Sequence, residues 1–82
     1  MYDAEIRAII AANIISNEPI DTYDAEASLQ NIGMDSISFI RIAVEIENHF
    51  GFEFPEDKLI IAEAGTIALL DQIVDSAMKD KG

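Results

Sequence analysis

Apolar residues recur at helical spacing in three segments of the chain, which predicts three amphipathic helices. The first helix is expected from Asp3, as its N-cap, to about Ser16, with isoleucines at positions 6, 9, 10 and 14 on one face. The second is expected to begin at Asp35 or Ser36 and to end at Phe50, because the glycine at position 51 favours helix termination.

The C-terminal part of the chain predicts one short helix and the third longer helix. The short helix runs from Glu56 to about Ala62, and Gly65 separates it from the next. Thr66 is the expected cap of the longer helix, whose apolar face consists of Ile67, Leu70, Ile73, Val74 and Ala77. Eighty-two residues allow one domain, residues 1–82. The fold class is therefore all-α, a small four-helix bundle of three longer helices and one short helix.

Residues 17–35 form the longest connection between predicted helices. Leu29 and Ile32 are its expected apolar anchors, and residues 28–32 could form a single helical turn. A connection of this length in a compact domain usually has a function. We therefore look for functional residues near its end.

The second helix has two apolar faces. At about 100° per residue, one arc is an ordinary core stripe and consists of Phe39, Ile42, Ala43, Ile46 and Phe50. A second arc contains Ile37, Ile40 and Val44, and Ser36 and Glu47 separate it from the first. Either the helix is buried on both sides, or the second arc meets partner proteins.

Composition and charge narrow the function classes. No apolar run approaches the ~20 residues that span a bilayer, and residues 1–16 lack a basic, signal-like start, so we expect a cytoplasmic protein without a membrane partner. Sixteen acidic residues against five basic ones give a net charge of −11, which repels nucleic acids. This charge suits docking to basic patches on enzymes, or it serves solubility alone. The absence of cysteine means that any thiol must come from a cofactor.

Ser36 is the candidate for chemistry, although its position also suits a capping residue. A serine hydrolase would need a base, and His49 lies 13 residues further along the same helix, roughly 20 Å away. We therefore expect no enzyme. The acidic residues Asp21 and Asp24 lack the spacing of a calcium-binding loop, so we expect no metal site.

The sequence around Ser36 resembles the acyl carrier protein family. Residues 32–37, Ile-Gly-Met-Asp-Ser-Ile, are similar to its Gly-x-Asp-Ser-Leu type signature, and residues 28–29, 46–51, 52–57 and 65–67 resemble further family segments in the same order. The resemblance implies a four-helix carrier fold and a 4′-phosphopantetheine group on Ser36, installed from coenzyme A by a phosphopantetheinyl transferase. The resemblance also implies that Asp35 is the family's acidic residue beside the attachment serine, where it caps the helix or takes part in the transferase site.

The same resemblance implies that the protein carries acyl or aminoacyl thioesters to loading, condensing and modifying enzymes of fatty acid, polyketide or nonribosomal peptide type. The predicted partner-binding residues are Ile37, Ile40, Arg41, Val44 and Glu47. Ser38, Arg41 and Asn48 stand where the family's fatty acid carriers have acids, which favours a stand-alone monomeric carrier of a specialised pathway. The alternative from another class is an unmodified acidic helical interaction module.

Overall fold

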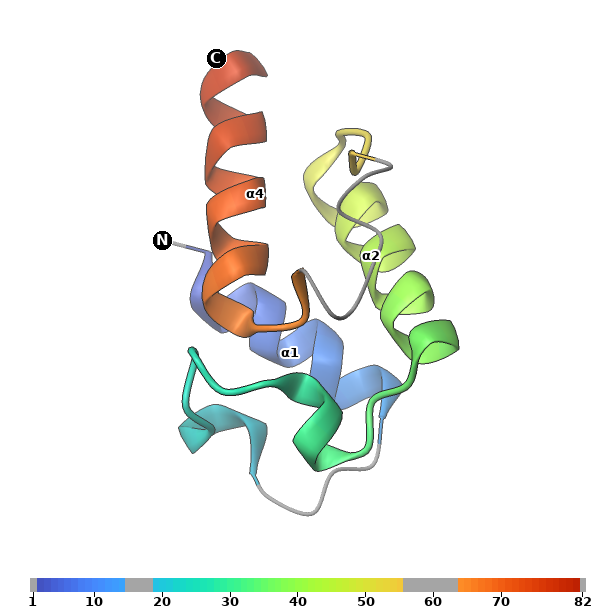
Figure 1. Cartoon of the computed structure of the whole chain (residues 1–82). Coiled ribbons are helices and arrows are strands. Elements are labelled where there is room, and N and C mark those ends of the chain that lie inside the picture. The colour runs from blue at the N-terminus through green and yellow to red at the C-terminus, as the bar shows by residue number, and fades with distance from the viewer. Residues whose placement is uncertain (1, 15–18, 56–63, 82) are drawn as a thin grey trace.

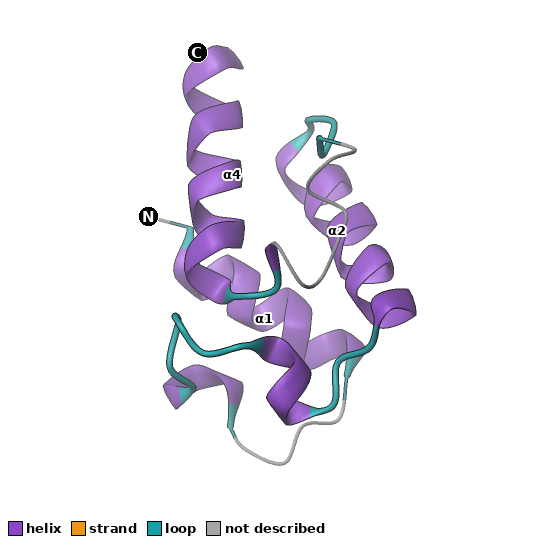
Figure 2. Cartoon of the chain, in the orientation of Figure 1, coloured by secondary structure: helices purple, strands orange, loops and turns teal. Residues whose placement is uncertain are grey.

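The computed structural model describes residues 2–14, 19–55 and 64–81. These residues contain three α-helices, α1 (Asp3–Asn13), α2 (Ser36–Phe50) and α4 (Ile67–Lys81), and two 3₁₀ turns, η1 (Ile20–Thr22) and η2 (Leu29–Ile32). Figure 2 shows helices and loops and no strand in this part of the chain, which confirms the all-α prediction. The short helix predicted from Glu56 to about Ala62 lies outside the described residues, so the count of four helices stays a prediction.

The first helix differs from its prediction at both ends. Asp3 lies inside the first turn and pairs with Arg7 at 2.6 Å, while Tyr2 takes the N-cap position without a side-chain capping bond. The capping role predicted for Asp3 is therefore wrong, because its carboxylate faces a cation one helical turn further along. Helix α1 ends at Asn13, before Ser16, because Ile14 has extended backbone angles, φ −135° and ψ 156°.

The other two helices begin as predicted. The Asp35 side chain caps α2, and Gly51 ends it in the left-handed conformation at φ 73°, which glycine adopts without steric cost. The Thr66 hydroxyl accepts a hydrogen bond from the Leu69 N–H at 3.1 Å and so caps α4. None of the helices in the described residues is long and apolar enough to cross a membrane.

Helix α1 joins the other two helices. It crosses near the lower ends of α2 and α4 in Figure 1 and packs against both. The buried side chains of all three helices belong to one apolar cluster: Ile6 and Ile10 from α1, Phe39, Ile42, Ala43 and Ile46 from α2, and Ile67, Leu70 and Val74 from α4. The core stripe predicted for the second helix is confirmed, with Phe50 partly buried at its end.

The connection before α2 is more ordered than expected. The predicted helical turn is present as η2, and the anchors Leu29 and Ile32 are buried. The structure adds η1 and two further anchors, Ile20 and Tyr23. The Arg7 guanidinium donates to the carbonyl oxygens of both, at 2.5 Å and 2.7 Å.

Two backbone hydrogen bonds also hold this connection to the start of α4, from the Leu29 N–H to Gly65 O at 2.8 Å and from the Ala68 N–H to Ala25 O at 2.9 Å. The connection is therefore attached to both α1 and α4. As a consequence, the position of Ser36, at which α2 begins, is fixed relative to α1 and α4.

Candidate functional site

Ser36 is the first residue of α2, and it is exposed. Its hydroxyl forms no hydrogen bond with another residue that the structure describes. Just before it, Gly33 ends η2 at φ 98°, and its N–H donates to the carbonyl oxygens of η2. This left-handed turn leads the chain from η2, in which Leu29 and Ile32 are buried, to the exposed serine, and its backbone angle favours glycine.

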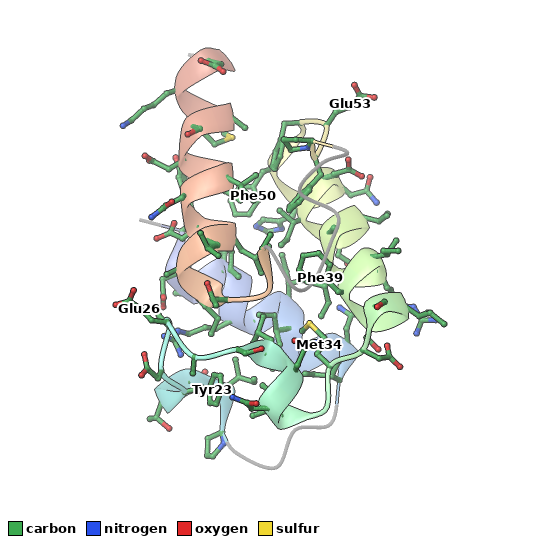
Figure 3. All side chains as sticks on the ribbon, viewed as in Figure 1. Tyr23, Glu26, Met34, Phe39, Phe50 and Glu53 are labelled. Carbon is green, nitrogen blue, oxygen red and sulfur yellow. The ribbon has the colours of Figure 1, made fainter. Side chains whose placement is uncertain are left out.

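Met34 anchors the segment between the turn and the helix. Its side chain is buried, in contrast to Asp35 and Ser36, which follow it and are exposed. Figure 3 shows Met34 and Phe39 near each other at the lower end of α2, on the side that faces the other elements. One side of this segment is thus held in the core while the serine hydroxyl faces solvent. Sequence reasoning did not identify this role of Met34.

Asp35 caps the helix that begins with Ser36. Its Oδ1 accepts a hydrogen bond from the Ser38 N–H at 2.8 Å, and its carbonyl oxygen accepts from the Phe39 N–H at 2.9 Å. The hydrogen bond from the Ser38 backbone lowers the pKa of the Asp35 carboxyl below its ordinary value, because it stabilises the charged form. The carboxylate is therefore ionised at neutral pH beside Ser36.

The second apolar face of α2 is exposed to solvent. Ile37 is 71% exposed, and Ile40 and Val44 are each 46% exposed, whereas Phe39 and Ile42 on the core face are fully buried. Burial of α2 on both sides is therefore wrong. We call the three exposed residues, Ile37, Ile40 and Val44, the exposed strip.

The two charged residues predicted to meet partners are in different situations. Glu47 is partly buried, and its Oε2 accepts a hydrogen bond from the Phe54 N–H at 2.6 Å. Its carboxylate thus connects α2 to the segment that follows, in which Phe54 is buried. Arg41 is exposed, and its guanidinium forms no ion pair or hydrogen bond with another described residue.

The other candidate groups lie apart from Ser36. His49 is exposed near the opposite end of α2, with its ring against Phe50 at a centroid distance of 4.7 Å. The carboxylate of Asp24 accepts from the Glu26 N–H at 2.9 Å, as in an ordinary turn. Within residues 2–14, 19–55 and 64–81, no group of three His, Asp or Glu side chains is placed to hold a metal ion.

A cavity of about 420 Å³ lies along α4, and Ser36 is not among its lining residues. Its walls are formed by Leu69, Ile73 and Ala77 from α4 and by Glu53 and Pro55 from the segment after α2, among others. The apolar pattern of the last helix did not identify this cavity, because the pattern cannot show how far the neighbouring segment lies from the helix.

Comparisons with known proteins agree with these features. The family model described as phosphopantetheine attachment site matches residues 4–70. Acyl carrier protein 3 of Ralstonia nicotianae (strain ATCC BAA-1114 / GMI1000) is 33% identical over 79 residues, which cover 95% of this chain and 86% of that protein. No solved structure matches the chain significantly. The chain therefore belongs to the acyl carrier protein family, whose members are carriers rather than enzymes and take 4′-phosphopantetheine as a covalent cofactor.

Proposed function

We propose that the protein carries acyl or aminoacyl intermediates as thioesters on a 4′-phosphopantetheine arm attached to Ser36, and that it delivers them to biosynthetic enzymes. The observation that carries this proposal is the exposed Ser36 hydroxyl at the start of α2, inside the segment matched by the attachment-site family. When bound, the arm supplies the thiol that this cysteine-free chain lacks and tethers the cargo near successive active sites.

The residues around Ser36 suit this attachment. The Ser36 Oγ is open to a transferase. In the reaction it loses its proton and forms the new bond to the phosphorus of the phosphopantetheine group, while the pyrophosphate linkage of coenzyme A breaks and 3′,5′-adenosine diphosphate leaves. The resulting phosphodiester would lie at the N-terminus of α2, where the helix dipole favours an anion. We infer that Asp35 caps the helix and also acts as an acidic group in the transferase complex.

Intact mass spectrometry tests the attachment. The full chain is incubated with coenzyme A and a promiscuous phosphopantetheinyl transferase, and we expect a mass increase of one phosphopantetheine. Ser36→Ala should abolish the increase. Ser38→Ala, two residues further along the same helix, should retain it and is the matched control. If several active transferases leave the mass unchanged, the chain acts instead as an unmodified acidic interaction module, and the carrier proposal fails.

We also infer that the protein serves a specialised pathway of polyketide, nonribosomal peptide or related type, and not housekeeping fatty acid synthesis. The support is the composition of α2, which has Ser38, Arg41 and Asn48 where the resemblance predicts acids. We assign Ile37, Ile40, Arg41, Val44 and Glu47 to the partner-facing part of the helix. Efficient loading and elongation of the phosphopantetheinylated protein by fatty acid synthase enzymes would contradict this assignment.

We further infer that residues 1–82 act as one monomeric domain in the cytoplasm. The single apolar cluster that joins α1, α2 and α4 supports one domain, and a net charge of −11 opposes self-association. Light scattering of the phosphopantetheinylated protein should give the mass of a single chain, and a stable dimer would contradict the monomeric state.

Cell fractionation should recover the protein outside the membrane fraction, and a membrane-bound pool would contradict the cytoplasmic location.

A further inference from the structure

Arg41 is unusual among the basic residues of this acidic protein. The structure describes three lysine or arginine side chains, those of Arg7, Arg41 and Lys79. Arg7 pairs with Asp3 at 2.6 Å, and Lys79 pairs with Asp75 at 3.2 Å. Arg41 is exposed and has no ion pair with any acid in the described residues, although Glu45 lies one helical turn further along. Among the described residues of this acidic chain, Arg41 is thus the basic side chain that the acids leave unpaired.

Arg41 also lies beside the exposed strip. Arg41 lies four positions after Ile37 and three positions before Val44 on the same helix, so these side chains are neighbours on the helix surface. An enzyme that covers the strip therefore also removes water from the arginine. A desolvated guanidinium without a partner is costly, and an acidic group opposite it offsets that cost.

We propose that Arg41 is a specificity-determining residue, which pairs with a carboxylate on the enzyme surface that covers the exposed strip. The proposal rests on the carrier function. The enzymes it fits have an apolar recess for Ile37, Ile40 and Val44 and an aspartate or glutamate at its edge. An enzyme with a basic residue at that point meets a like charge, which disfavours docking.

A charge exchange across the interface tests this pairing. The probe is a malonyl transferase of fatty acid synthesis with a basic docking patch for carriers, together with a variant in which the arginine facing the second helix is changed to glutamate. Loading of the phosphopantetheinylated protein is measured as kcat/KM for wild-type Arg41 and for Arg41→Glu. We expect wild type to prefer the glutamate variant, and Arg41→Glu to prefer the unmodified enzyme, each by about tenfold.

Lys79→Glu on α4 is the matched control, because it makes the same change in net charge on another helix. It should leave the preference between the two enzymes unchanged. The proposal is overturned if wild type and Arg41→Glu show the same ratio of kcat/KM between the two enzymes. It is also overturned if Lys79→Glu changes this ratio as much as Arg41→Glu does. These results are distinct from failure of the carrier function, in which Ser36 would accept no phosphopantetheine and no loading could be measured with any variant.

Discussion

The two apolar faces of α2 have the same kinds of side chains and opposite exposure. Phe39, Ile42 and Ile46 are buried against α1 and the rest of the core, whereas Ile37 and Ile40 lie in solvent on the same helix. Burial of an isoleucine or phenylalanine side chain stabilises a fold by about 1.5–3 kcal/mol. The exposed face forgoes a large part of this contribution. The hydrophobicity of a helical face therefore does not determine whether the face is buried.

The position of α2 explains the difference. Helix α1 covers one side of α2, and the start of α2 is held in register by Gly33, Met34 and Asp35. No described element covers the exposed strip, and Ser36 lies at its N-terminal end. The arrangement places the proposed attachment point and the proposed docking residues on one accessible side of the protein.

The largest effect is expected on the buried face. Phe39→Ala removes a fully buried ring and should reduce the free energy of unfolding by about 3–5 kcal/mol, because it leaves a cavity. This is a large fraction of the 5–15 kcal/mol that is typical of a whole domain. Urea unfolding followed by circular dichroism measures it. A loss below about 1 kcal/mol would show that the buried face is less tightly packed than the structure indicates.

A smaller effect is expected at the turn that sets the register of α2. Gly33→Ala should cost about 1–2 kcal/mol, because alanine is strained in the left-handed conformation. The position has open space for a methyl group, so a steric clash does not contribute. Gly33→Asn should lose less, since asparagine tolerates this conformation. Equal losses in the two variants, measured by urea unfolding, would indicate that the backbone angle is not the cause.

The capping carboxylate should give a pH-dependent effect. Because folding lowers the pKa of Asp35, its ionised form contributes stability that is complete above the ordinary aspartate pKa of about 3.9 and is lost as the pH falls through the lower folded pKa. Asp35→Asn should therefore melt below wild type at pH 7, and the difference should narrow below about pH 4. Melting curves of both proteins from pH 2 to pH 7, in about one-unit steps, measure this difference in melting temperature.

The control for this experiment is Glu45→Gln, which removes a charge from the exposed side of the same helix. It separates capping from the general effect of net charge. A difference between Asp35→Asn and wild type that stays constant over the whole pH range would contradict the capping role of the charged carboxylate.

The smallest effect on stability is expected on the exposed strip. Ile40→Ala should change the free energy of unfolding by only about 0.5 kcal/mol, because the residue is still 46% exposed in the folded protein. Its effect should appear in docking, as a loss of about 1 kcal/mol, or roughly fivefold in kcat/KM for loading by a partner enzyme. Leu69→Ala, an exposed leucine on α4, is the control. An equal decrease in loading for both variants would argue against a docking role for the strip.

Local signals in the sequence predicted the start of two helices, the end of one of them and the candidate site. The Asp-Ser pair before an apolar period, the glycine at 51 and the threonine at 66 each act on the nearest turn of backbone, so their effects do not depend on distant residues. The same reasoning failed at Asp3. The sequence allows two local contacts for the Asp3 carboxylate, a capping bond to the backbone and an ion pair with Arg7. In the structure the helix begins one residue earlier than expected, with Tyr2 as the N-cap, and Asp3 pairs with Arg7.

The contacts between distant segments could not be predicted. The sequence did not indicate that Arg7 binds the carbonyl oxygens of Ile20 and Tyr23, or that Glu47 accepts from the Phe54 N–H. These bonds join residues 7 to 16 positions apart, and they form only because the intervening loop brings the two groups together. Carbonyl and amide groups are present at every residue, so no side-chain pattern marks the ones that are used.

The sequence by itself determined that the chain is helical, that α2 begins near Ser36 and that this helix has two apolar faces, because periodicity and capping are properties of neighbouring residues. Only the tertiary structure decided which face is exposed, since burial depends on where α1 and the connection before α2 lie. It also decided that Glu47 is bonded to the backbone while Arg41 stays unpaired among the described residues. Two charged residues on one helix thus differ because their surroundings come from elsewhere in the chain.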